Sequence, residues 1–154
     1  MVFDNPNSST VRYLCEIAGV NSLPQENVFS FKTNEDVIKY IAENDSMIGV
    51  VGINWMYQPK PEMKKYVDLT TILSIKNTNS NDYVYPSQEN IAKRKYPLAR
   101  VLFAVNCQGY EGLGMGFSSF IAGEKGQRII LKSGLAPMRE PSRNIRIRNK
   151  IETN

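Results

Sequence analysis

Apolar residues recur at helical spacing in two segments of the first third of the chain. In the first segment they stand at i, i+3, i+4 and i+7 and form one face of an amphipathic helix: Val11, Leu14, Cys15 and Ala18. Ser8, Ser9 or Thr10 can cap the first turn of this helix. Gly19 follows its last apolar residue and favours a left-handed end. The pattern therefore predicts a helix that begins at a cluster of small polar residues.

The second segment is TNEDVIKYIAEN, which carries a capping-box pattern at its start. Thr33 is a good N-cap, and Asp36 stands three residues later. The apolar positions that follow again form one stripe: Val37, Ile38, Ile41 and Ala42. A second amphipathic helix is expected here.

The chain starts with a short apolar strand, and three later segments also have patterns that predict strands. Residues 47–53 (MIGVVGI) form a continuous, β-branched apolar run, which is typical of a strand buried on both faces. Residues 66–75 (YVDLTTILSI) alternate Val67, Leu69, Thr71 and Leu73 with polar neighbours, so a half-exposed strand is expected. Residues 98–105 also have a strand-like composition.

The rest of the chain is predicted to be mainly helical. Short helices are expected in 86–95, 112–123 and 124–134, with a loop at 77–82. In 112–123 one face carries Leu113, Phe117, Phe120 and Ile121, and Gly134 can end the last helix. Strands and helices that alternate in this order predict an α/β fold.

Composition is that of one ordinary soluble domain. The chain has 154 residues, of which 42% are hydrophobic and 22% charged. No apolar run is long enough to span a bilayer, and the first residues do not resemble a signal peptide.

The net charge of +4 is concentrated in a basic tail, residues 139–154. Such a tail can bind nucleic acid, but it has no aromatic residues that could stack on bases. A solvated terminus is the favoured interpretation, and nucleic acid is not an expected partner.

The reactive side chains exclude several kinds of enzyme. The sequence has no histidine, so Ser-His-Asp and Cys-His nucleophile systems are ruled out and an ordinary zinc site is not expected. Cys15 and Cys107 are each expected to be small buried apolar residues. No catalytic residues, metal site or cofactor is predicted.

The polar cluster before the first helix has the chemistry of an anion site. A helix N-terminus offers unpaired N–H groups and a partial positive charge. Hydroxyls of Ser8, Ser9 and Thr10 add neutral donors, and Arg12 adds charge. Asn7 stands in the same cluster. The alternative is that these residues form only a turn and a cap.

Four motifs, in order, resemble the C-terminal half of a phosphate ABC-transporter substrate-binding protein, a type II periplasmic binding protein. Ser8-Ser9-Thr10 stands where the family has Ser-Gly-Thr, followed by IGVVGINW, YPLARVLF, and FSSFIAGEKGQRIILKSGLAP. The similarity extends to about Met138 and is greatest to Bacteroidetes-type members. It implies an extracytoplasmic receptor that captures phosphate or a similar oxyanion and delivers it to ABC-transporter membrane subunits.

The resemblance also implies how the chain is divided. Residues 1–97 correspond to the second, ligand-binding lobe, 98–138 to the segment that returns to the first lobe, and 139–154 to the tail. The N-terminal strands of the first lobe have no counterpart, so the chain is expected to be a fragment. Its exposed lobe surface is then expected to favour a homodimer.

Two positions depart from the family pattern. Asp4 stands where the family has an oxyanion-binding Arg, and Ser9 replaces the Gly. Arg12 is a candidate to supply the missing charge. These departures favour, as the alternative function, a sensing or protein-interaction module on the same fold.

Further candidates lie outside the polar cluster. Asn54, Trp55 and Tyr57 follow a predicted buried strand, where they either contact ligand or pack at a hinge. Arg100 is expected to pair with a carboxylate. Localisation is expected to be periplasmic or membrane-anchored on the extracytoplasmic side, although this chain shows no signal segment.

Overall fold

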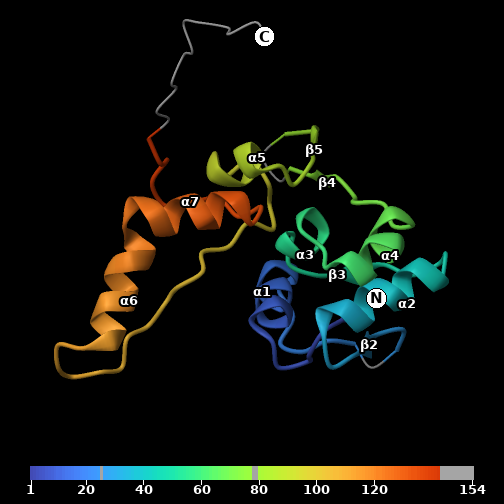
Figure 1. The fold of residues 1–154 in the computed structure, drawn as a ribbon. Helices are drawn as coiled ribbons and strands as arrows, with labels where there is room; N and C mark the ends of the chain where they lie inside the picture. Colours follow the sequence, from blue (N-terminus) through green and yellow to red (C-terminus); the bar gives the residue numbers. More distant parts are fainter. Residues whose placement is uncertain (25, 78–79, 143–154) are drawn as a thin grey trace, which may run out of the picture. The chain divides into compact units, whose positions relative to one another are not determined.

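The computed structural model describes residues 1–24, 26–77 and 80–142 (Figure 1). These residues form two compact units. Unit 1 contains Met1–Val101 and Ser133–Ala136, and unit 2 contains Leu102–Lys132 and the described residues from Pro137 onward. No helix within the described ranges is both long enough and apolar enough to cross a membrane.

Unit 1 is built on a three-stranded parallel sheet of order β2-β1-β3. Strand β1 (Val2–Phe3) lies in the middle, and β2 (Phe29–Ser30) and β3 (Gly49–Val50) lie on either side. Val2 pairs with Phe29 in one neighbour and with Gly49 in the other. Helix α1 (Ser9–Ala18) connects β1 to β2, and helix α2 (Asn34–Glu43) connects β2 to β3. Parallel strands joined by helices confirm the predicted α/β class.

The core of unit 1 lies between this sheet and its two helices. Phe3, Val11 and Cys15 form a buried cluster, around which four partly buried residues pack: Leu14, Leu23, Val28 and Val50. Helix α2 lies close against β3: a Cβ added to Gly49 would stand only 2.8 Å from Cγ1 of Ile41. The residues of the two predicted apolar stripes are buried or half-buried, except Ala18, which is exposed. Cys15 is buried as predicted, whereas Cys107 is exposed, so the expectation for Cys107 is wrong.

Both long helices of unit 1 begin as their sequences predict. Ser8 is the N-cap of α1, and Gly19 at its end has a φ of +66°. In α2 the amide of Asp36 donates to Oγ1 of Thr33 over 3.1 Å, and this hydroxyl donates to the Asp36 carboxylate over 2.7 Å. Caps are local interactions, which is why the sequence alone places these helix starts.

Shorter elements complete unit 1. They are α3 (Asn54–Tyr57), the 3₁₀ helix η1 (Pro61–Met63), α4 (Lys64–Asp68), the antiparallel pair β4 (Ile75–Lys76) and β5 (Tyr83–Val84), and α5 (Gln88–Ala92). Helix α5 confirms the short helix expected in 86–95. The loop predicted at 77–82 joins β4 to β5, although residues 78–79 lie outside the described ranges.

Three strand predictions fail in whole or in part. The run 47–53 contributes only Gly49–Val50, which are half-buried at the edge of the sheet rather than buried on both faces. Of the predicted strand 66–75 only Ile75 lies in a strand, β4, because Val67 belongs to helix α4 and Leu69 and Leu73 are exposed. Residues 98–105 form no strand, and they pair with no described segment. A strand needs a partner, and composition alone does not supply one.

Unit 2 contains helices α6 (Leu113–Ala122) and α7 (Glu124–Lys132), both as predicted. They meet at a tight corner, since a Cβ on Gly126 would stand 2.3 Å from the carbonyl oxygen of Phe120. Buried Gln127 holds this corner: its amide nitrogen donates to the Ile121 carbonyl over 2.8 Å, and its oxygen accepts the Arg139 amide over 3.2 Å. The predicted basic tail lies outside the described residues from 143 onward.

Candidate anion-binding site

The polar cluster lies at the carboxyl end of the central strand. Strand β1 ends at Phe3, and α1 begins at Ser9. The chain first passes to β2 on one side of β1 and then crosses to β3 on the other side. In open α/β sheets, ligands bind outside the carboxyl ends of the strands where the connections diverge in this way. The cluster therefore occupies the usual ligand position of its fold class.

Part of the cluster is used to form the turn and the cap. The amide of Asn7 donates to the side-chain oxygen of Asn5 over 2.8 Å, and the amide of Ser8 donates to the Asn5 carbonyl over 3.0 Å. The hydroxyl of Ser8 accepts the amide of Val11 over 3.3 Å. Ser8 is thus the cap, and its hydroxyl oxygen is already engaged by the main chain.

Ser9 and Thr10 retain the donors that an anion needs. Among the described residues, neither of their main-chain amides has a hydrogen-bond partner. Ser9 is exposed and Thr10 is half-buried. Two orphan amides in the first turn are the usual basis for anion binding at a helix start.

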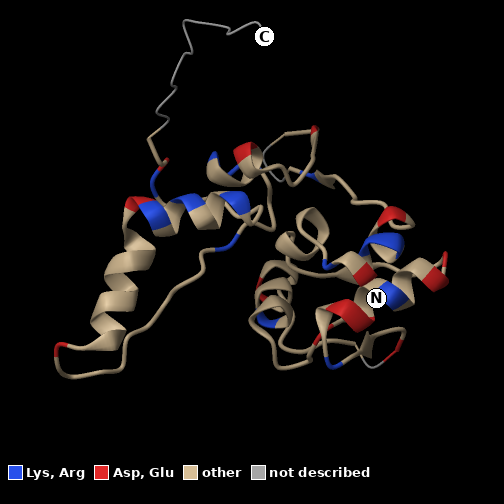
Figure 2. Cartoon of the chain, in the orientation of Figure 1, with Lys and Arg blue, Asp and Glu red and all other residues tan. Residues whose placement is uncertain are grey.

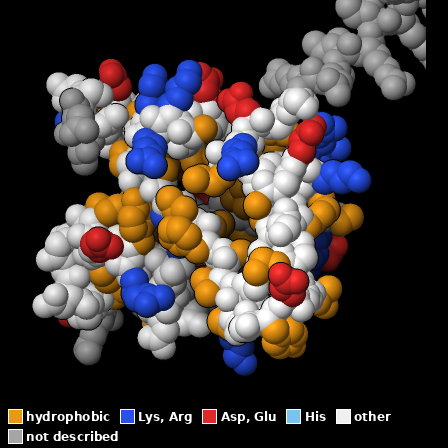
Figure 3. Space-filling view, turned by 90° about the vertical axis from the view of Figure 1, so that its left-hand side faces the viewer, with side chains coloured by type: hydrophobic (Ala, Val, Ile, Leu, Met, Phe, Trp, Pro, Cys, Tyr) orange, Lys and Arg blue, Asp and Glu red, His pale blue; other side chains and the backbone are white. Residues whose placement is uncertain are grey.

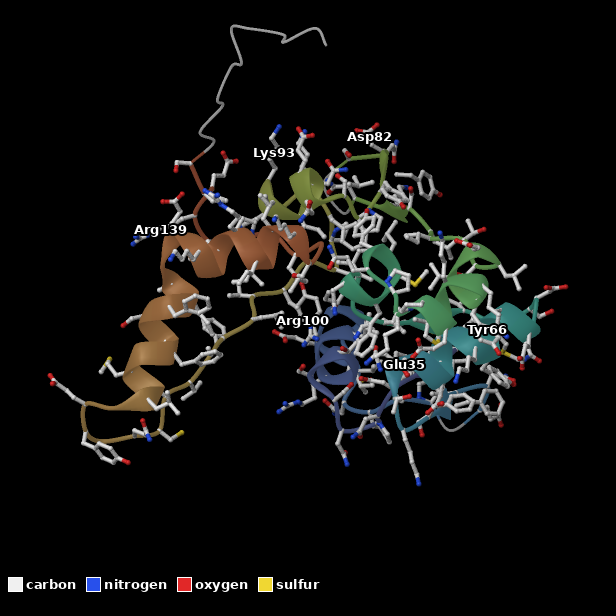
Figure 4. All side chains as sticks on the ribbon, viewed as in Figure 1. Glu35, Tyr66, Asp82, Lys93, Arg100 and Arg139 are labelled. Atoms are coloured by element: carbon white, nitrogen blue, oxygen red, sulfur yellow. The ribbon has the colours of Figure 1, made fainter. Side chains whose placement is uncertain are left out.

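Arg100 supplies a positive charge at this point (Figure 4). Its guanidinium donates to the hydroxyl of Ser9, and over 3.1 Å to the hydroxyl of Thr10. Each hydroxyl that accepts from Arg100 keeps its own proton to donate. The prediction that Arg100 pairs with a carboxylate is wrong, because no ion pair among the described residues includes Arg100.

Tyr13 explains why Arg100 reaches the start of α1. Its hydroxyl donates to the carbonyl of Ala99 over 2.9 Å and lies 3.3 Å from that of Pro97. Ser9 and Tyr13 are four residues apart in α1, so they share one face of the helix. Residues 97–99 lie along this face, and the next residue, Arg100, therefore reaches the first turn of α1 with its side chain.

The electrostatic arrangement favours a negative ligand. The first turn of α1 contains no acidic residue, so the partial positive charge of the helix start is not compensated there. The guanidinium of Arg100 adds a full positive charge at the same turn. An anion bound by these groups would relieve the repulsion between them.

The other residues predicted for the site make no hydrogen bond or ion pair with Arg100 that the structure records. Asn7 and Arg12 are exposed on either side of the first turn, and no described residue contacts the guanidinium of Arg12 as an ion-pair or hydrogen-bond partner. Asp4 is half-buried, and its carboxylate accepts from the Asn5 amide over 2.8 Å and from the Asn34 side chain over 3.1 Å. Asp4 thereby connects the end of β1 to the start of α2.

Of the residues singled out after β3, Tyr57 makes packing contacts within unit 1. The hydroxyl of Tyr57 donates to the Pro86 carbonyl over 3.3 Å. Gly134, with a φ of +85°, lies so close that an added Cβ would stand 3.0 Å from the Tyr57 side chain. Burial, with a smaller effect from Tyr85, raises the pKa of Tyr57 above its ordinary value. Asn54 and Trp55 lie in the same short helix, α3.

The contact between Arg100 and α1 joins residues that are 90 and 91 positions apart. No local pattern reveals such a pair. The available signal was Tyr13, a polar aromatic residue one turn after Ser9, together with a charged residue inside an apolar run.

The family model described as a PBP superfamily domain (PBP_like_2) matches residues 1–125. The chain belongs to the PBP superfamily. This is a family of solute-binding domains, and a binding role outside the cytoplasm is the function it indicates. No curated protein and no solved structure shows significant similarity to the chain.

Proposed function

We propose that this PBP superfamily domain captures a small oxyanion, phosphate in the first place, at the start of α1. The observation that carries the proposal is the placement of Arg100 on the hydroxyls of Ser9 and Thr10, next to two orphan amides. In this proposal the domain works without catalysis. It delivers its ligand to the membrane subunits of an ABC transporter, from the periplasm or from a membrane anchor on the extracytoplasmic side.

Each residue of the site has a distinct role in this proposal. Ser9 and Thr10 donate through their amides and hydroxyls, and Arg100 supplies charge and further N–H donors. Ser8 fixes the first turn as its cap. Arg12 and Asn7 form the outer edge of the site. Charge-assisted hydrogen bonds are the stronger kind, so Arg100 is expected to contribute most of the affinity.

The expected affinity of the chain is weak, with a dissociation constant of about 1 mM or higher. The proposed donors come from one helix start and one loop, and Ser9 and Arg100 are exposed to water. An exposed anion keeps much of its hydration, and salt screens its attraction to the guanidinium. Tight capture requires donors on the opposite side of the ligand as well.

Phosphate titration followed by NMR tests the proposal at residue resolution. At constant ionic strength, the amide signals of Ser9 and Thr10 should shift with added phosphate more than those of α7. Arg100→Gln should weaken binding about tenfold or more, because a hydrogen bond to a charged group contributes ~1.5–3 kcal/mol. Arg139→Gln, which removes an exposed Arg from unit 2, is the matched control and should leave the affinity unchanged.

Two results would count against this assignment. Shifts spread evenly over the basic surface would show that phosphate acts only as a general counterion. An unchanged affinity in Arg100→Gln, together with a loss in Arg12→Gln, would transfer the charge role to Arg12.

The second candidate function is a sensing or protein-interaction module without transport. The involvement of Asp4 in the structural bonds of unit 1 favours it, because the family's oxyanion-binding Arg is replaced by a residue used for packing. Thermal unfolding with phosphate, sulfate, molybdate and small organic anions separates the two candidates. Stabilisation by one anion supports capture, and no stabilisation by any of them supports the interaction module.

A further inference from the structure

Unit 2 exposes several large apolar side chains. Leu102, Phe103 and Val105 are 63%, 83% and 80% exposed, and Leu113 at the start of α6 is 86% exposed. Phe117 and Phe120 follow Leu113 at helical spacing and are also exposed. We call these six residues the α6 surface; Figure 3 turns the α6 side of Figure 1 toward the viewer and shows many exposed hydrophobic side chains there.

Segment 102–105 has the character of a strand without a partner. Its residues, Leu-Phe-Ala-Val, favour extended structure. None of its main-chain N–H or C=O groups bonds to another described residue. Gln108 then fixes the turn toward α6, because its side-chain oxygen accepts the Gly114 amide over 2.7 Å. An unpaired apolar strand of this kind is a template for pairing with another chain.

Helix α6 is mostly apolar, with Ser118 and Ser119 as its polar residues. It contains no charged residue and no buried residue, whereas α7 carries charges of both signs (Figure 2). A helix with large apolar residues and no charge normally packs against other apolar surfaces. Within unit 2, α7 is the only described helix that packs on it, so most of α6 is left uncovered.

The charges of this region indicate which partner fits. From residue 101 to residue 123 the only charged residue is Glu111. In a two-fold interface the residues near the axis face their own copies, so like charges there would repel, and a surface almost free of charge suits a second copy of this chain. The area is also sufficient: exposed side chains of this size together offer on the order of the ~800 Å² per partner that a stable dimer buries.

From these observations we infer that the chain forms a two-fold dimer in which segment 102–105 pairs with its own copy as antiparallel strands, covered by α6 of both copies. The pairing satisfies the free main-chain groups, and α6 buries its apolar side chains against the partner. The inference does not depend on anion binding, because all the residues involved belong to unit 2.

Sedimentation and light scattering over a range of concentrations test the oligomeric state of the full chain. Interfaces of this area have dissociation constants that are typically micromolar or lower, so a dimer is expected at tens of micromolar. Phe103→Lys should give a monomer, because the dimer would have to bury two positive charges, one from each copy. Leu69→Lys is the matched control: Leu69 is 72% exposed in unit 1, and its replacement should leave the dimer intact.

Disulfide cross-linking tests the strand pairing itself. With Cys107→Ser as background, a single cysteine is placed in turn at each of positions 102 to 105. Antiparallel two-fold pairing predicts a sharp maximum in disulfide dimer at the residue that meets its own copy, since Cα atoms must lie within ~7 Å. A monomer at every concentration overturns the inference. A dimer that survives Phe103→Lys, or a cross-linking profile without a maximum, overturns the pairing of 102–105.

Discussion

Arg100 shows how one side chain changes the chemistry of a helix start. Without it, Ser9 and Thr10 would be two ordinary hydroxyls in a first turn. With it, the hydroxyl oxygens accept from a cation, and their protons remain available to a ligand. Lysine would not be equivalent, because the planar guanidinium reaches two oxygens at once with a fixed separation. Tyr13 is equally specific, since its hydroxyl fixes the backbone just before Arg100.

Tyr96, in the same segment, gives a prediction about pH. Burial raises the pKa of Tyr96 above its ordinary value near 10. Below pH 10 the phenol is neutral in the folded and unfolded chains, so it makes no difference to stability. Above pH 10 the unfolded chain loses the proton first, and the free energy of unfolding falls as pH rises through the folded pKa.

The measurement is urea unfolding between about pH 8.5 and pH 11, followed by the fluorescence of Trp55. Tyr96→Phe should make the loss of stability with pH smaller than in the unmodified chain. Tyr83→Phe, which changes an exposed tyrosine of β5, is the control and should leave the slope unchanged. Equal slopes for the unmodified chain and Tyr96→Phe would show that Tyr96 is not buried in solution.

At the scale of elements, helices were predicted from the sequence far better than strands. The starts of α1 and α2 depend on hydrogen bonds between residues three positions apart, and their faces depend on a regular spacing. The strand predicted at 66–75 is confirmed only at Ile75, because alternation also occurs in a short helix followed by an exposed loop. Segment 98–105 has strand composition, but its first residues are held by Tyr13 and the rest find no partner among the described residues.

Helix α1 allows capping and ligand binding to be measured separately. Ser8→Ala removes the side-chain cap, so the free energy of unfolding should fall by about 1 kcal/mol. Ser9→Ala removes an exposed hydroxyl and should change stability by less than about 0.5 kcal/mol, yet weaken phosphate binding. Urea unfolding and NMR titration of both variants make the test. Equal losses of stability in the two variants would mean that Ser9 also acts as a cap.

Each of the two units of the described chain has stabilising contacts of its own. The core cluster around Phe3 lies in unit 1, and the corner at Gly126 and Gln127 lies in unit 2. The predicted division at residues 97 and 98 rests on family resemblance, and it stays a prediction. What the sequence could not reveal is Arg100, because its contact with α1 depends on the path of the chain over 90 residues.

Two glycines of unit 2 test this separation. Gly126→Ala should destabilise the α6–α7 corner by about 1–3 kcal/mol, because the new Cβ would meet the Phe120 carbonyl. Gly116→Ala has open space around it within α6 and should stabilise that helix by up to ~1 kcal/mol. The loss of stability in Gly126→Ala should appear as earlier helix unfolding in circular dichroism. The unfolding transition followed by the fluorescence of Trp55, in unit 1, should not shift. A parallel shift of both signals would show that the two units unfold together.

The unequal exposure of the two cysteines has a practical consequence. A thiol reagent will modify Cys107 and leave buried Cys15 untouched under native conditions. Since Trp55 is the sole tryptophan, a dye on Cys107 gives the unmutated chain one donor and one acceptor for energy transfer, one in each unit. The transfer efficiency with and without added phosphate then reports directly whether ligand changes the distance between the two units.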